Sequence, residues 1–174
     1  MTTRNLSLLL LWGCRLAIAG LLVTMLIGAW VSFQNPEVLV LARGDVPIMG
    51  DLSLWAWLGS VVVAAAVMAV AIYVLLQAHQ LFDIYRAGDL LSAAAATRIS
   101  RIGKGTLLLA IASVLAHPVL TVLLTSANPV GQRAVSVALS SNDASLLLLA
   151  GLLTVIGRAL REAAAVAAEN KAFV

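Results

Sequence analysis

His117 and the residues after it are the part of this sequence whose side-chain types and spacing most resemble a functional site. His117 and Pro118 stand inside a long apolar stretch, and Thr121 follows about one helical turn later. An ionisable side chain inside an apolar stretch is a candidate for carrying a proton, binding an ion or bonding to a neighbouring helix. We therefore take His117 and Thr121 as candidate functional residues, with a purely structural hydrogen bond as the alternative for His117.

A haem or metal site is not expected. His79, the other histidine, stands near the end of a different apolar stretch, whereas His117 lies about fourteen residues inside its own, or about 20 Å deeper by helical rise. The two axial ligands of one iron must lie at the same depth. Cys14 is the single cysteine, so no thiolate cluster can form. The sequence has no H-E-x-x-H, G-x-S-x-G or phosphate-binding glycine motif, so we expect neither a cofactor nor an enzyme.

The composition indicates what surrounds these residues. Hydrophobic residues make up 62% of the 174-residue chain and charged residues 11%, and the mean hydropathy is +1.04. In soluble globular domains hydrophobic residues make up roughly 45–50% of the chain and charged residues about 25%. A soluble domain with this composition would lack the polar surface that its apolar volume requires. The composition therefore excludes a soluble enzyme, a nucleic-acid-binding domain and a disordered chain, and indicates an integral membrane protein.

Four apolar stretches are long enough to cross a bilayer, which takes about 20 residues in a helix. The predicted fold is an all-α membrane protein, a four-transmembrane-helix bundle that forms one domain over residues 1–174. The first span ends at Gln34-Asn35-Pro36, because proline cannot continue the helical hydrogen bonds, and the fourth begins at Ser141, Asn142 or Asp143. The predicted spans cover about residues 16–33, 54–77, 102–126 and 143–164, with outer loops at 34–53 and 127–142 and an inner loop at 78–101.

Basic residues gather on one side of the predicted membrane. The side with both termini and the inner loop carries nine of the eleven basic residues, and the other side carries only Arg43 and Arg133. Short loops rich in basic residues stay on the cytoplasmic side of a membrane. Trp30 and Trp55 mark the opposite, outer interface. We therefore predict a multi-pass protein of the bacterial inner membrane with both termini in the cytoplasm.

The outer loops contain two strand-like segments. Residues 37–42 form an apolar run that favours a strand, and residues 133–140 alternate with a period of two. A lone strand is unstable in water, so order in either segment requires pairing. The sequence leaves two alternatives open, a small β-sheet that caps the bundle or irregular loops.

Small residues recur four positions apart within the predicted spans. Examples are Ser60-Ala64 in the second span and Ala159-Ala163-Ala167 in the fourth. Such spacing lets helix backbones approach closely in lipid. We predict that the helices pack through these positions.

The distinctive polar and aromatic residues gather on the predicted cytoplasmic face. After Gly88, Ser92 is predicted to cap a helix that runs through Ala93–Ala96 to Lys104. Arg98, Arg101 and Lys104 recur every third residue and share one broad face of this helix. Basic residues there attract anionic headgroups, worth about 1 kcal/mol each near the surface, or they bind a protein partner. The residues that we predict to bind a partner are Phe82, Tyr85, Arg98, Arg101, Lys104, Arg158, Arg161, Glu162, Glu169 and Asn170.

The inner loop and the tail resemble a known family. The loop reads Leu81-Phe82-x-x-Tyr85-x-x-Gly88, Arg98-Ile99-x-x-Ile102-Gly103 follows, and the chain ends Glu169-Asn170-Lys171-Ala172-Phe173-Val174. This pattern resembles a widespread bacterial family of small four-span membrane proteins, classed only as a domain of unknown function, over nearly the whole chain. The family usually has glycine where this chain has Ala163. Some members are encoded beside a small helix-turn-helix regulator, so the resemblance implies a membrane protein that holds a DNA-binding partner.

Three functions stay open on the sequence alone. The first is a non-enzymatic membrane protein that binds a cytoplasmic protein through its loop and tail, with no direct contact to nucleic acid. The second is a small oligomeric transporter or pore that uses His117. The third is an accessory subunit of a larger membrane complex.

Overall fold

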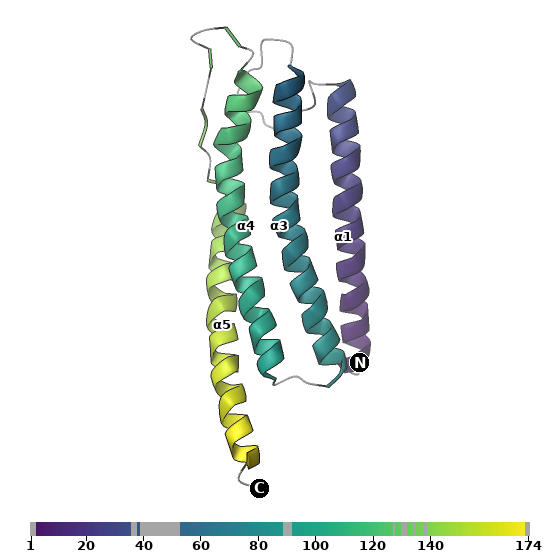
Figure 1. Ribbon diagram of the computed structural model, residues 1–174, viewed down its shortest axis with the longest axis vertical. Coiled ribbons are helices and arrows are strands. Elements are labelled where there is room, and N and C mark those ends of the chain that lie inside the picture. The colour runs from purple at the N-terminus through teal and green to yellow at the C-terminus, as the bar shows by residue number, and fades with distance from the viewer. Residues whose placement is uncertain are drawn as a thin grey trace.

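Four long helices make up most of the described part of the chain (Figure 1). They are α1 (Thr3–Gln34), α3 (Leu54–Arg86), α4 (Ala93–Thr125) and α5 (Ser141–Ala172). This computed structural model describes residues 3–35, 38, 53–88, 92–126, 128–129, 132–133, 135–137 and 139–172, with side chains between residues 7 and 166. Each helix is long and apolar enough to cross a membrane. For the described residues the prediction of an all-α fold is confirmed, with four helices long and apolar enough to span a membrane.

Local sequence signals set the ends of α3 and α4. The Ser53 hydroxyl accepts the N–H of Ala56 at the start of α3, and the Ser92 hydroxyl accepts the N–H of Ala95 at the start of α4, both at 3.2 Å. After α3 ends, Gly88 has a φ of +95°, a conformation that favours glycine. The predicted start at Ser92 is confirmed, and the helix that begins there runs without a break to Thr125.

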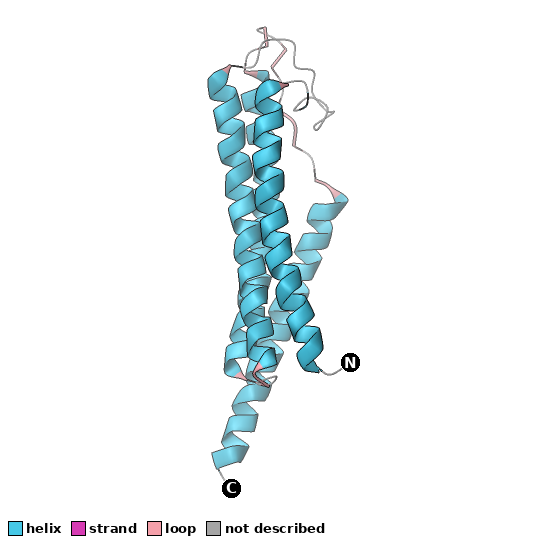
Figure 2. Cartoon of the chain, turned by 90° about the vertical axis from the view of Figure 1, so that its right-hand side faces the viewer, coloured by secondary structure: helices cyan, strands magenta, loops and turns pink. Residues whose placement is uncertain are grey.

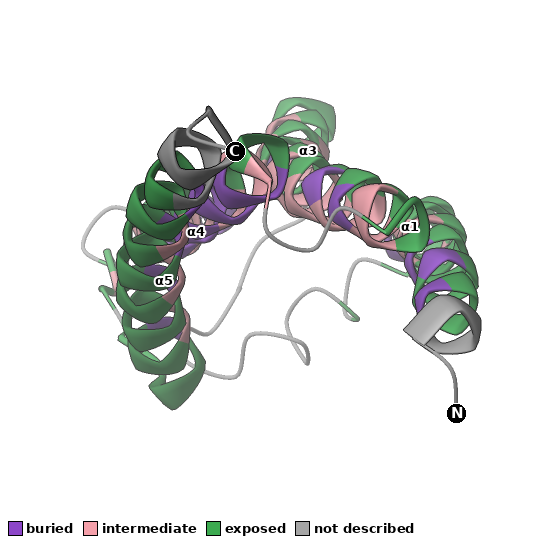
Figure 3. Ribbon diagram, turned by 90° about the horizontal axis from the view of Figure 1, so that it is seen from below, coloured by how far each residue is buried: buried purple, intermediate pink, exposed green. Residues whose placement is uncertain are grey.

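The four helices form an open arc (Figure 3). α1 packs on α3, α3 on α4 and α4 on α5, and within the described residues no other pair of helices makes close backbone contact. Successive helices run in opposite directions, so both ends of the chain lie at one end of the arc (Figure 1). We call this the basic end, because its side chains include Arg15, Arg86, Arg98, Arg101, Lys104, Arg158 and Arg161.

The closest packing joins α4 to α5 through small residues. Ala150, Gly157 and Ala164 are buried at intervals of seven residues along α5. A Cβ atom on Gly157 would lie 2.8 Å from the backbone nitrogen of Ser100, closer than real Cβ contacts allow. A seven-residue repeat of small side chains is typical of two helices that pack along a narrow seam.

Two of the three packing positions predicted for the fourth span are wrong, and the side chain of the third, Ala167, lies outside the described part of the chain. Ala159 and Ala163 are exposed, whereas Gly157 and Ala164 form the seam. The four-residue spacing in the sequence shows which small residues share a face of α5, but it does not show which face meets a neighbouring helix. The position of α4 decides that, and it selects the seven-residue repeat.

α5 begins well below the end of α4 that lies opposite the basic end (Figures 1 and 2). Gly157 faces Ser100, and Gly103 faces the backbone of Thr154, which fixes the antiparallel register of the two helices. Continued along the helices, this register places Ser141 beside the turn around Leu115, roughly ten residues or about 15 Å short of Thr125. The first turn of α5 therefore lies deep within the apolar part of the arc.

The segment between α4 and α5 does not form the predicted strand. Its described residues 132–133, 135–137, 139 and 140 are neither helix nor strand. The N–H of Ser136 donates to the hydroxyl of Thr121 at 3.3 Å, so the segment is held against α4 instead of pairing with another strand. The period-two pattern arises because Ser136 faces α4 while Val135 and Val137 are exposed. The predicted sheet cap is therefore wrong for the described residues of 133–140. The other predicted strand, residues 37–42, lies outside the described residues apart from Val38.

Candidate functional site

Arg15 links α1 to α3 at the basic end. Its Nε donates to Nε2 of His79 at 3.2 Å, and its guanidinium lies 5.5 Å from the centre of the Trp12 ring. Because Nε2 accepts this bond, the proton of the neutral ring is on Nδ1, and Nδ1 lies 3.9 Å from the carboxylate of Asp83. His79 is therefore part of a contact between helices, and the exposed Arg15 lies where a basic side chain can reach lipid headgroups.

Three of the predicted partner-binding residues are half-buried within the fold. A terminal nitrogen of Arg98 donates to Oε1 of the buried Gln77 at 2.9 Å, which joins α4 to α3. Phe82 is half-buried, and Tyr85 packs against the small core at the basic end. That core consists of Leu81, Ala95 and Ile99.

Four other predicted residues come together in one cleft between α4 and α5. The cleft has a volume of about 420 Å³ and is lined by Ser100, Lys104, Thr154, Arg158, Arg161 and Glu162. Nε of Arg158 lies 3.3 Å from Oε1 of Glu162, and both side chains are exposed, so the pair contributes only about 0.3–0.5 kcal/mol. Arg101 is exposed but does not line the cleft. The side chains of Glu169 and Asn170 lie outside the described part of the chain.

Asp143 is the polar residue whose position the sequence analysis missed. Its Oδ2 accepts the N–H of Ser140 at 3.0 Å and the Ser140 hydroxyl at 2.7 Å, and the Ser140 hydroxyl accepts the N–H of Asp143 at 3.2 Å. This reciprocal arrangement is a capping box, which starts α5 one residue before the predicted cap. The spacing Ser140-x-x-Asp143 was the available signal for it.

Asp143 also lies beside the predicted candidate on α4. Its side chain is buried, and Ser113 and His117 lie close enough to the carboxylate to interact with it. The start of α5 thus brings a carboxylate and an imidazole together in the apolar interior. The predicted spans place residue 143 at the outer end of the fourth span, next to the outer loop, because sequence alone does not give the depth at which α5 begins.

His117 and Ser113 border a cavity between α1, α3 and α4. The cavity has a volume of about 430 Å³, and the rest of its lining is apolar: Leu21, Ala64, Val67, Met68, Ala71, Ala116 and Leu120. Thr121 does not line it. The hydroxyl of Thr121 donates to the carbonyl of Pro118 at 2.9 Å and accepts the N–H of Ser136. The structure thus separates the two candidates, since His117 faces a cavity and Thr121 holds a backbone segment.

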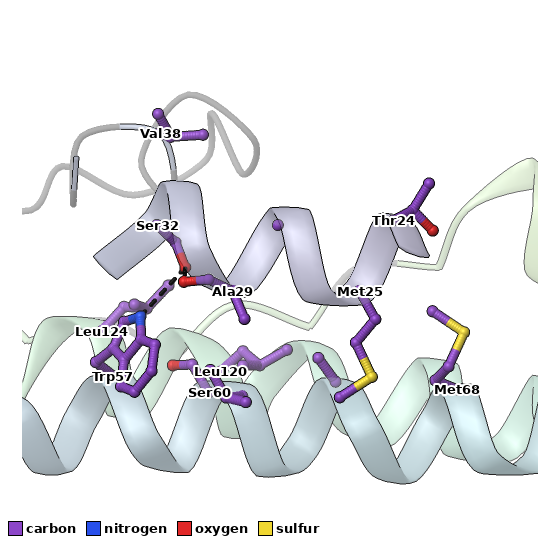
Figure 4. A pocket seen from close by; sticks show the side chains of 13 residues that line it. Thr24, Met25, Ala29, Ser32, Val38, Trp57, Ser60, Met68, Leu120 and Leu124 are labelled. Carbon is purple, nitrogen blue, oxygen red and sulfur yellow. Dashed lines mark hydrogen bonds between the residues drawn. The ribbon is translucent and has the colours of Figure 1, made fainter. Parts of the chain in front are cut away.

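A second cavity of about 330 Å³ adjoins the first, toward the end of the arc opposite the basic end (Figure 4). Nε1 of Trp57 donates to the Ser32 hydroxyl at 3.2 Å across it and ties α3 to α1. The Trp57 ring also meets the Phe33 ring edge-on, with centres 5.2 Å apart. The two cavities share Ala64, Met68 and Leu120 in their linings.

The described residues contain no group of three side chains that could hold a metal ion. The two histidines also stay apart. Gly105 of α4 contacts Tyr73 of α3, and His79 and His117 lie on opposite sides of that contact.

No family model, curated protein or solved structure matches this chain. The function is therefore inferred from the cleft, from the cavity and from the end of α5, which extends past α3 and α4 at the basic end (Figure 2). The family resemblance of the loop and tail stays a prediction.

Proposed function

We propose that this chain is a non-enzymatic protein of the bacterial inner membrane that binds a cytoplasmic protein through the projecting end of α5. The observation that carries the proposal is that α5 extends past α3 and α4 at the basic end (Figure 2). The small helix-turn-helix regulator suggested by the family resemblance is the partner class we favour.

The projecting end of α5 has the features of a docking segment. Ala164 is the last buried residue that the structure describes in α5, and the helix continues eight residues to Ala172, or about 12 Å. Val166, just past Ala164, is 57% exposed. A helix that leaves the membrane without packing on its own protein presents all of its faces to a partner.

The distribution of charge supports a cytoplasmic position for this end. Basic side chains from α1, α3, α4 and α5 meet there, and an excess of basic residues marks the cytoplasmic side of short loops. Both termini then lie in the cytoplasm, where a soluble regulator can reach the tail.

Truncation of the chain after Val166 tests the proposal. This variant keeps Ala164 and therefore the seam between α4 and α5, and it removes only the projecting turns. We expect a pull-down in mild detergent to recover a stoichiometric protein partner with the full chain and to lose it with the truncated chain, because the docking segment is gone.

Photo-crosslinking in intact membranes provides the control. A crosslinking side chain at Val166 is expected to give a protein adduct, whereas one at Leu148, which is 77% exposed in the apolar part of the same helix, is not. Equal partner recovery with the full and truncated chains would contradict the proposal. Recovery of the chain only within a larger membrane complex would favour an accessory subunit.

A second candidate, a small transporter or pore, is favoured by the cavity that reaches His117. The neighbouring Asp143 adds a second ionisable group at the same place. Intramembrane pairs of this kind occur in proton and ion pathways.

Proton flux into liposomes separates the candidates. If the protein transports protons, we expect His117→Ala to lower the flux at least about a hundredfold, the low end of what a positioned proton-transfer group contributes. His79→Ala removes the other imidazole, which lies away from the cavity, and should leave the flux unchanged. Wild-type flux equal to that of empty liposomes would contradict transport.

A further inference from the structure

The cleft between α4 and α5 has the charge of a phosphate-binding site. Three of its lining side chains are basic, and the single acid, Glu162, pairs with Arg158. Lys104 and Arg161 then leave the cleft with a net positive charge. The described residues supply no acidic partner for either of them.

The floor of the cleft offers a hydroxyl donor. Ser100 lines the cleft and is only 8% exposed, and among the described residues its side chain has no hydrogen-bond partner. Thr154 differs, because its hydroxyl already donates to the carbonyl of Ala150 at 2.8 Å. Ser100 can therefore donate to an oxygen of a bound anion that Lys104 and Arg161 attract.

The depth of the cleft matches the headgroup region of a membrane. Lys104 and Thr125 are 21 residues apart along α4, or about 32 Å by helical rise, close to the thickness of the hydrocarbon core. With Thr125 at one edge of that core, Lys104 lies at the other edge. Phosphate groups of lipids occupy this level.

An apolar stripe continues from the cleft toward the opposite end of α4. Leu108, Ile111 and Leu115 follow Lys104 on the same helical face, and they are 53%, 47% and 60% exposed. On α5, the exposed Gly151 and Leu147 lie about one and two turns beyond Thr154, respectively, in the same direction. Acyl chains attached to a phosphate in the cleft can lie along this stripe, which a free phosphate would leave empty.

We propose that the cleft binds the phosphate of an anionic phospholipid of the leaflet at the basic end. Lys104 and Arg161 hold the phosphate, Ser100 donates to it, and the acyl chains follow the stripe on α4. This inference does not depend on the proposed protein partner, because the partner segment lies beyond Ala164 and outside the cleft.

Native mass spectrometry tests the proposal. It measures the binding of phosphatidylglycerol to the delipidated protein in detergent. We expect K104Q/R161Q to weaken phosphatidylglycerol binding roughly 30-fold, at about fivefold for each basic residue near the headgroups. The matched control R86Q/R101Q removes two exposed basic residues at the same end that do not line the cleft, and it should change binding less than about threefold. Arg161→Lys keeps the charge and should keep most of the affinity.

Two further arms separate the possible sources of phosphate. Phosphatidylcholine, a zwitterionic lipid, should bind at least tenfold more weakly than phosphatidylglycerol, and inorganic phosphate should not displace the bound lipid at equal concentration. Equal weakening in the two double variants would overturn the proposal, because it would show attraction to charge in general. Displacement by inorganic phosphate would overturn the assignment to a lipid.

Discussion

Gly157→Ala is expected to lower the Tm of the detergent-solubilised protein by about 3–10 °C. The new Cβ would lie 2.8 Å from the nitrogen and 3.1 Å from the Cα of Ser100, and backbone atoms cannot rotate away as a side chain can. Overpacking of this kind costs about 1–3 kcal/mol, and each kcal/mol shifts Tm by about 2–4 °C in a chain of this size. Thermal unfolding followed by circular dichroism measures the effect.

Gly151→Ala is the matched control on the same helix. No atom lies within 4 Å of the position of its Cβ, and alanine favours a helix over glycine by up to about 1 kcal/mol. Its Tm should therefore stay the same or rise. Gly103→Ala should resemble Gly157→Ala, because its Cβ would lie 2.9 Å from the nitrogen of Thr154. Equal Tm values for Gly151→Ala and Gly157→Ala would contradict the seam.

The sequence predicts the features of this fold that depend on one stretch of chain. α1 ends at Gln34, where Pro36 was expected to stop it, and Ser92 caps the helix predicted to follow Gly88. Apolar length and capping chemistry act over a few neighbouring residues, so a sequence pattern records them. The four spans follow from the same signals.

The features that the sequence did not predict depend on how two helices meet. The depth of Asp143 follows from the register between Gly157 and Ser100, and the cleft exists because Lys104 and Arg161 come from different helices. Basic residues were recognised as a group because the sequence predicts them on one side of the membrane. Their division into Arg98, which bonds to Gln77, and Lys104, which lines the cleft, requires the contacts themselves.

Asp143→Ala is expected to lower Tm by about 2–10 °C. The substitution removes two hydrogen bonds from Ser140 to the carboxylate and leaves the N–H of Ser140 without its acceptor. Loss of an N-cap interaction costs about 0.5–2 kcal/mol, and the cost is larger where water cannot replace the partner. The control is Ser145→Ala, two residues further along α5, where an exposed hydroxyl has the carbonyl of Ser141 as its one hydrogen-bond partner among the described residues. We expect its Tm to stay within about 2 °C of wild type.

A double-mutant cycle shows whether Ser140 and Asp143 act as one unit. Because their three hydrogen bonds are reciprocal, Ser140→Ala with Asp143→Ala should cost little more than either change alone. Asp143→Asn then isolates the charge, since the amide keeps an oxygen for Ser140 but removes the negative charge beside His117. A carboxylate in apolar surroundings is costly unless nearby groups compensate it, so a rise in Tm for Asp143→Asn would mean that Ser113 and His117 do not compensate that charge. A fall that disappears when His117→Ala is also present would show that the imidazole stabilises it.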